Sequence, residues 1–132
     1  MIVLILKLRI CIVLNLPSET YGLIFSIVAI HHGRKQQVSD LIDKIYSALV
    51  KDGKIFVTLP IYWPKEESKG NVEFVGDGEF ILLTGPEKGL IHSSYREEEI
   101  ERILSKFNKV SIQKNKKKGI EKKGKWIISA EK

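Results

Sequence analysis

The sequence predicts an α/β fold with a partial Rossmann-like sheet. An apolar strand (residues 23–30), an amphipathic helix (38–50) and a second strand (54–59) follow one another with short joints, which is typical of a right-handed βαβ unit. A small hairpin then interrupts the pattern, and a helix with two terminal strands completes it. At 132 residues, the chain is expected to form one domain.

The N-terminal stretch from Met1 to Leu16 is strongly apolar but contains Lys7 and Arg9. A membrane helix needs about 20 largely uncharged residues, so this stretch is too short and too broken to be one. A signal peptide carries its charges before the apolar run, not inside it. Ile, Val and Leu in two short blocks instead predict one or two buried strands and no membrane role.

The central elements follow from hydrophobic spacing. Residues 23–30 form a continuous apolar run, which is typical of a strand covered on both faces. Apolar residues at positions 38, 41, 42, 45 and 49 have helical spacing. We expect Asp52-Gly53 to end this helix, because glycine tolerates the left-handed conformation needed there.

The middle of the chain predicts a loop and a hairpin. Residues 60–70 form an irregular loop, and the strands expected over 72–75 and 79–83 flank Gly76-Asp77-Gly78. Gly76-x-Gly78 is the only G-x-G pattern of the chain. A phosphate-binding glycine loop follows a strand and opens a helix, whereas this one joins two strands, so it is interpreted as a turn.

The C-terminal part predicts a helix and an antiparallel strand pair. Ser94 and Glu97 have the spacing of a capping box, so we expect the helix to begin there. Its buried stripe is expected to consist of Ile100, Ile103, Leu104 and Phe107. Strands over 109–113 and 125–130 would then be joined by a lysine-rich loop.

This order of elements resembles the second half of the class I S-adenosylmethionine (SAM) methyltransferases. Residues 15–26 are similar to the family's stretch from D-A-x-x-L-P to Y-D-L-I-x-S. Ile30-His31-His32 is similar to the family's L-H-H motif at the end of a strand. Residues 48–54 are similar to the family's L-L-K-P-G-G-x motif. Residues 87–92 and 126–132 look like those of the type 11 and tellurite-resistance-like methyltransferases. The resemblance implies sheet order 4-5-7-6 with an inserted hairpin. It implies one truncated domain over 1–132, in which 1–16 is an atypical strand region and 17–132 the C-terminal half.

The resemblance implies SAM as the cofactor and a small molecule as the methyl acceptor. The family holds SAM with a glycine-rich loop after a strand, and no such loop is found here. Ile12 and Gly22 stand where the family has acidic residues. Asn15, Leu16 and Ile30 remain as positions on the cofactor side. We therefore expect the chain alone not to bind SAM and to be inactive by itself.

Candidate chemical residues follow the two central strands, because ligands of open α/β sheets lie outside the carboxyl ends of the strands. These residues are His31 and His32 after the first strand, and Tyr62 and Trp63 after the second. In the family the first of these loops faces the transferred methyl group, so His31 or His32 is a candidate general base. The alternative is that the two histidines only pack the loop before the helix.

Glu87, His92 and Tyr95 are further candidates, which would close over the substrate from the inserted segment. The alternative is an ordinary polar loop that enters a helix. An adjacent histidine pair with one distant histidine is poor ligand spacing, so no metal site is predicted. Cys11 is the only cysteine, which excludes an intrachain disulfide and favours a cytoplasmic location.

The net charge of +6 is concentrated near the C-terminus, where residues 106–132 carry ten lysines and two glutamates. Seven lysines lie between Lys114 and Lys125 and could contact RNA phosphates. This stretch has no interleaved aromatic residue for base stacking, so a solvated hairpin tip is the favoured interpretation.

Other functions stay open at this stage. Without the family's first strand, one edge of the strand over 23–30 would be exposed and would favour association. Residues 2–14 could cover that edge, or a second copy or a complementing chain could. The alternatives to a methyltransferase are therefore a non-catalytic assembly module or a gene remnant, and an RNA (tRNA) methyltransferase fragment is the alternative for the substrate.

Overall fold

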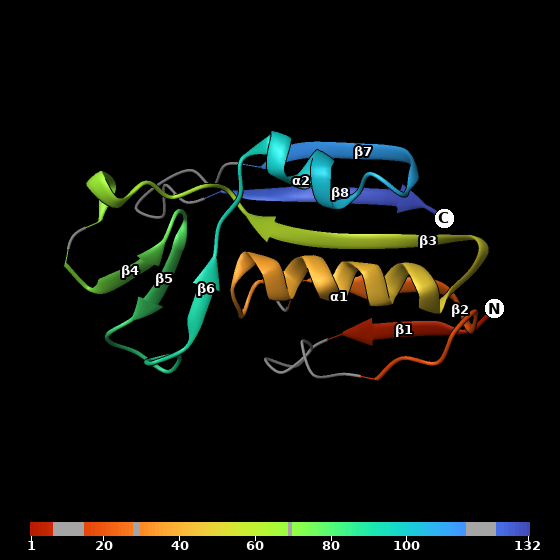
Figure 1. The fold of residues 1–132 in the computed structure, drawn as a ribbon, viewed down its shortest axis with the longest axis horizontal. Helices are drawn as coiled ribbons and strands as arrows, with labels where there is room; N and C mark the ends of the chain where they lie inside the picture. Colours follow the sequence, from red (N-terminus) through yellow and green to blue (C-terminus); the bar gives the residue numbers. More distant parts are fainter. Residues whose placement is uncertain (7–14, 28–29, 69, 116–123) are drawn as a thin grey trace.

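The computed structural model describes residues 1–6, 15–27, 30–68, 70–115 and 124–132. Their strands form a five-stranded sheet in the order β1-β2-β3-β8-β7 and a three-stranded sheet in the order β4-β5-β6 (Figure 1). The element bounds are β1 Val3–Leu6, β2 Tyr21–Ser26, α1 Lys35–Ala48, β3 Leu49–Pro60, β4 Val72–Gly76, β5 Glu79–Leu82, β6 Ile91–Ser93, α2 Glu97–Ile103, β7 Asn108–Asn115 and β8 Lys125–Glu131.

The main sheet is mixed. β1, β2 and β3 are parallel, and β8 runs antiparallel to both β3 and β7. Ile24 of β2 lies opposite Ile55 of β3, which lies opposite Ala130 of β8. These three side chains are buried and form the centre of the sheet. The predicted βαβ unit and the terminal strand pair are confirmed.

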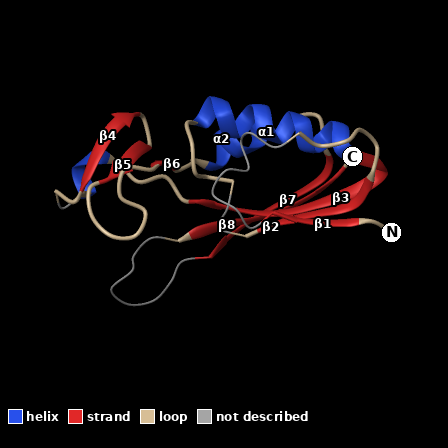
Figure 2. Cartoon of the chain, turned by 90° about the horizontal axis from the view of Figure 1, so that it is seen from below, coloured by secondary structure: helices blue, strands red, loops and turns tan. Residues whose placement is uncertain are grey.

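The two α-helices, α1 and α2, cover the same face of the main sheet (Figure 2), and a short 3-10 helix, η2 Lys65–Glu67, lies between β3 and β4 in the chain. Helix α1 buries five residues against it, at the helical spacing expected from the sequence: Val38, Leu41, Ile42, Ile45 and Ala48. From α2 and the turn after it, Ile100, Leu104 and Phe107 join the same core, as predicted, while Ile103 is only partly buried. No described helix is long and apolar enough to cross a membrane.

The predicted end of α1 was wrong. The helix ends at Ala48, and β3 begins at Leu49, five residues before its predicted start at Lys54. Leu49 is fully buried and lies opposite Tyr21 of β2, so sheet pairing takes this residue out of the helix. The left-handed residue is Asp52, with φ 61°, and not Gly53.

The predicted start of α2 was also wrong. The N-cap is Arg96, whose backbone N–H donates to Oε2 of Glu99 at 2.7 Å in the capping box. The Ser94 hydroxyl instead donates to the backbone carbonyl of Gly78 at 3.0 Å. Ser94 therefore connects the turn between β4 and β5 to the segment before α2, and does not cap the helix.

The small sheet contains the predicted hairpin and a third strand that was not predicted. β4 and β5 are antiparallel around residues 76–78, and β6 pairs with β5 so that His92 lies opposite Phe80. Trp63, Val72 and Phe80 form a second core here, with Trp63 and Phe80 in edge-to-face contact at 5.0 Å.

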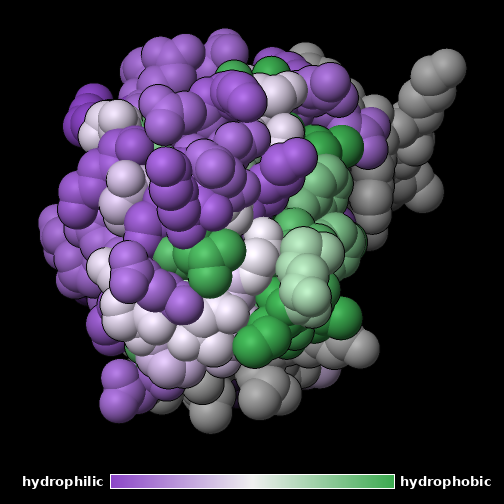
Figure 3. Space-filling view, turned by 90° about the vertical axis from the view of Figure 1, so that its right-hand side faces the viewer, coloured by the Kyte–Doolittle hydropathy of each residue, from purple (hydrophilic) through white to green (hydrophobic). Residues whose placement is uncertain are grey.

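Strand β1 covers the free edge of β2, which is one of the two possibilities that the sequence left open. The expectation that this stretch is buried was wrong for most of its described residues, because β1 is itself the last strand at that edge. Leu6 is buried, whereas Met1, Ile2, Val3 and Ile5 are exposed. Figure 3 faces the end of the molecule where the N-terminus lies and shows hydrophobic residues gathered over part of that surface.

Candidate functional site

All three histidines of the chain lie together where the small sheet meets the main sheet. His31 and His32 lie between β2 and α1, and His92 lies in β6. The ring centres are 4.2 Å apart for His31 and His32, 4.8 Å for His32 and His92, and 5.5 Å for His31 and His92. The backbone N–H of Ser93 donates to the carbonyl of His31 at 3.0 Å, which holds β6 against this loop.

Glu87, in the loop between β5 and β6, bridges two of these histidines. Its Oε1 lies 3.2 Å from Nε2 of His32, and its Oε2 lies 2.7 Å from Nε2 of His92. Burial raises the pKa of Glu87, but the hydrogen bond from His92 and the attraction of both rings outweigh burial and lower the pKa overall. The carboxylate is therefore ionised, and its side chain is 30% exposed.

His31 has a different environment. Its Nδ1 is buried and has no hydrogen-bond partner among the described residues. Burial, followed by the influence of His32 and His92, lowers the pKa of His31 from 6.5 to about 3. His31 is therefore a neutral imidazole near pH 7, and its preference for the neutral form makes it a weak base.

The other predicted substrate residues lie around this cluster but do not all face it. Tyr95 is buried, its hydroxyl is 2.8 Å from Oγ of Ser93, and burial raises its pKa.

Trp63 packs in the core of the small sheet. Tyr62 donates to Oδ1 of Asp77 at 2.7 Å and stacks under the Arg96 guanidinium at 3.7 Å. Of the predicted set, Glu87 and His92 are the two that contact the histidine pair.

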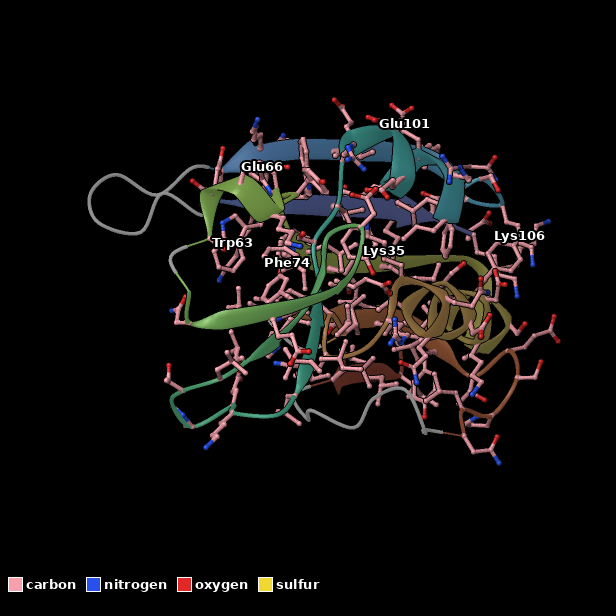
Figure 4. The ribbon with its side chains drawn as sticks, turned by 60° about the vertical axis from the view of Figure 1, so that its left-hand side comes forward. Lys35, Trp63, Glu66, Phe74, Glu101 and Lys106 are labelled. Atoms are coloured by element: carbon pink, nitrogen blue, oxygen red, sulfur yellow. The ribbon has the colours of Figure 1, made fainter. Side chains whose placement is uncertain are left out.

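A charged network at the start of α1 was not predicted. Lys35 Nζ lies 2.7 Å from Oε1 of Glu99, and its backbone N–H donates to Oε2 of Glu79 at 2.8 Å. Figure 4 labels Lys35 close to the place where the small sheet meets the helices. The same Nζ lies 5.6 Å from the ring centres of Tyr62 and Tyr95. These residues come from separate elements, so no local motif in the sequence indicates them.

The predicted cofactor-side positions do not form one site. Ile30 is fully buried in the main core. Asn15 and Leu16 line a shallow depression beside α1, together with Asp43, Lys44 and Ser47. Ile12 and the greater part of the lysine-rich stretch considered for RNA fall in residues 7–14 and 116–123, outside the described residues.

The spacing argument against a metal ion does not hold in the folded chain. His31, His32 and His92 each offer a nitrogen, and these three atoms all lie within 4.8 Å of one another. β6 brings His92 back to the end of β2, although the two histidine positions are far apart in the sequence. Sequence spacing is therefore no ground for excluding a metal site here.

No known family model and no curated protein matches this sequence. Solved structures of SAM-dependent methyltransferases are nevertheless similar in fold. A Burkholderia thailandensis 1,6-didemethyltoxoflavin-N1-methyltransferase, solved with 1,6-didemethyltoxoflavin and S-adenosylhomocysteine, matches 92% of this chain with a TM-score of 0.64 and 14% identity. Enzymes from Methanosarcina mazei (TM-score 0.63, 14% identity, 91% of this chain) and Mesorhizobium loti (0.62, 13%, 92%) are similar too.

The chain spans 48% of the Burkholderia protein, 63% of the Methanosarcina protein and 67% of the Mesorhizobium protein. At this level of identity, the likeness establishes the methyltransferase-type α/β fold and does not by itself carry the activity.

Proposed function

We propose that this chain is the C-terminal half of a SAM-dependent methyltransferase domain with a small-molecule acceptor. The observation that carries the proposal is the joint placement of His31, His32, His92 and Glu87 beyond the carboxyl end of β2, in a fold that methyltransferases share. Ligands of open α/β sheets bind at that end of the strands. The Burkholderia protein, which was solved with bound 1,6-didemethyltoxoflavin, supports a small molecule as the substrate class.

The strand order supports the same assignment. We assign β2, β3, β8 and β7 to the family's strands four, five, seven and six, and β4–β6 to the inserted segment. β1 pairs in parallel with β2 and so occupies the place beside strand four that strand one takes in the family.

The cofactor half of the pocket is the missing part in this proposal. In the family, the chain after strand one is rich in glycine, because backbone N–H groups must come close to the cofactor. Here residues 7–14, which follow β1, contain no glycine. We therefore infer that this chain does not bind SAM unless another polypeptide segment supplies that loop.

His32 is the stronger candidate for the general base expected of the histidine pair. Its Nε2 is held by Glu87, which is the arrangement of a base oriented by a carboxylate. His31 lacks such a partner on its Nδ1. Glu87 is partly exposed, so an acceptor could reach the Glu87–His32 pair from solvent.

Calorimetric titration with S-adenosylhomocysteine is the first test, with folding checked by circular dichroism. The proposal expects no binding by the chain alone. A micromolar dissociation constant, equivalent to about 8 kcal/mol, would contradict the inferred loss of the cofactor pocket.

A chimera tests the family assignment itself. Residues 15–132 would be joined to the N-terminal part of the Methanosarcina enzyme, which supplies the loop after strand one. The proposal expects S-adenosylhomocysteine binding by the chimera and none by a control whose loop glycines are replaced by valine. A folded chimera without binding would refute the assignment.

A non-catalytic assembly module is the second candidate, and one observation favours it. The edge strand β1 exposes Val3 and Ile5 next to Met1 and Ile2. An exposed apolar edge is a site for pairing with another chain. Sedimentation measurements of the purified chain test this candidate, and a monomer at all accessible concentrations would exclude self-assembly.

A further inference from the structure

His92 has a hydrogen-bond acceptor at each ring nitrogen. Nδ1 lies 3.1 Å from the backbone carbonyl of Leu90, and Nε2 lies 2.7 Å from Oε2 of Glu87. A neutral imidazole carries one N–H only. If that proton is on Nδ1 and is donated to Leu90, the Nε2 lone pair points at a carboxylate. A positive centre must then lie between Nε2 and Glu87, either a second proton or a metal ion.

The environment of His92 is the one that metal-binding histidines have. Such histidines donate the ring N–H that is not used for the metal to a backbone carbonyl or a carboxylate, which fixes the tautomer and the ring orientation. The Leu90 carbonyl has this role for His92. The nitrogen left over, Nε2, is the one directed at Glu87.

His31 provides an independent observation. It is more than nine-tenths buried, and its Nδ1 finds no hydrogen-bond partner among the described residues. A buried polar atom without a partner is destabilising, and each case in a folded protein calls for an explanation. A metal ion bound by this nitrogen would supply the missing partner.

The distances are compatible with one ion after small side-chain rotations. The three histidine nitrogens lie within 4.8 Å of one another. Zinc–nitrogen bonds of about 2.0–2.1 Å in a tetrahedron place neighbouring ligand atoms roughly 3.3 Å apart. The histidine rings are at the end of a loop and on a three-residue strand, so the required adjustment is within the range of χ-angle changes.

We propose that His31, His32, His92 and Glu87 form a binding site for one divalent transition metal ion of the Zn²⁺ class. Imidazole nitrogens suit Zn²⁺ and its neighbours in the series, whereas Mg²⁺ and Ca²⁺ require mainly oxygen ligands. The ion would join the small sheet to the end of β2. Four protein ligands complete the tetrahedral coordination of Zn²⁺, which is the arrangement of structural zinc sites.

The metal proposal is independent of SAM binding, because the two ligands are titrated separately. The protein, free of any affinity tag and treated with chelator, is titrated with Zn²⁺ by calorimetry and with Co²⁺ by visible absorption. We expect one ion per chain, the absorption of a nitrogen-ligated Co²⁺, a higher Tm with Zn²⁺, and no competition from Mg²⁺.

Glu87→Gln is the main variant, since it keeps the shape and the hydrogen-bonding capacity of a partly exposed side chain. It should weaken Zn²⁺ binding by at least about tenfold. Glu67→Gln, an exposed carboxylate in the 3-10 helix between β3 and β4, is the matched control and should leave binding unchanged. Cys11→Ser should also leave it unchanged, which excludes the one thiol as the ligand.

Two results would overturn the proposal. One is the absence of saturable Zn²⁺ or Co²⁺ binding by the folded wild-type chain at submillimolar concentrations. The other is equal affinity in wild type, Glu87→Gln and His32→Gln, because ions would then bind elsewhere. Either result would leave the hydrogen bond between His92 and Glu87 as the explanation of the geometry.

Discussion

Trp126 of β8 donates its indole N–H to the backbone carbonyl of Tyr95, with Nε1 and the oxygen 2.7 Å apart. The same carbonyl accepts the backbone N–H of Tyr62 at 2.7 Å. Tyr95 lies between β6 and α2, and Tyr62 follows β3. One buried oxygen therefore connects three segments at the junction of the two sheets.

Trp126→Phe should destabilise the chain by about 1–3 kcal/mol, since it removes this hydrogen bond and part of a buried ring. The Tyr95 carbonyl keeps its bond from Tyr62, so a fully unsatisfied group does not result. Urea unfolding followed by circular dichroism measures the change. An unchanged free energy of unfolding would show that the bond does not hold the junction together.

Gly78→Ala should destabilise the small sheet more than Gly85→Ala does. Both glycines have positive φ, 72° and 86°, which costs an L-residue about 1 kcal/mol. A Cβ on Gly78 would lie 2.9 Å from the Ser94 carbonyl oxygen, whereas nothing lies within 4 Å of one on Gly85. We expect about 1 kcal/mol for Gly85→Ala and roughly 1–3 kcal/mol more for Gly78→Ala. If urea unfolding shows the same loss of unfolding free energy for the two variants, the argument that a Cβ on Gly78 is crowded is wrong.

Asp77 predicts a pH-dependent contribution to stability. Hydrogen bonds from Arg96 and then Tyr62 lower its pKa from 3.8 to about 2. Because the pKa is lower in the folded state, the contribution is present above about pH 4 and is lost as the pH falls toward 2. The difference in unfolding free energy between wild type and Asp77→Asn should shrink over that range.

The Asp77 effect should be small and should weaken at high salt, because its side chain is 64% exposed. Glu101→Gln, on the exposed face of α2, is the control for the loss of one negative charge. If the difference in unfolding free energy between wild type and Asp77→Asn stays constant from pH 6 to pH 2, the hydrogen bond from Arg96 does not lower the pKa of Asp77 as assigned here.

The sequence predicted the elements whose signals are local. The spacing of Val38, Leu41, Ile42 and Ile45 indicates one face of a helix and does not depend on the tertiary fold, so α1 could be predicted. The end of α1 was missed because the pairing of Leu49 with Tyr21, a long-range contact, overrides the turn signal at residues 52–53. Local patterns cannot contain that information.

The candidate site was predicted residue by residue but not as a unit. His31 and His32 were identified from the strand that precedes them, and Glu87 and His92 from the inserted segment. Their meeting depends on β6, a three-residue strand that pairs with β5. Such a short strand has no periodicity to detect, so the sequence alone could not show that the three histidines meet and that two of them contact one carboxylate.

The last prediction concerns the exposed edge of the main sheet. Ile5 of β1 is 53% exposed at one end of the strand order, and Val110 of β7 is 39% exposed at the other. If β1 pairs with a second chain, Ile5→Lys should weaken self-association by at least about tenfold, because charged edge residues oppose strand pairing. Val110→Lys adds the same charge to the other edge strand and should have little effect. Sedimentation velocity over a concentration series measures both, and equal effects of the two variants would show that net charge, not the β1 edge, controls association.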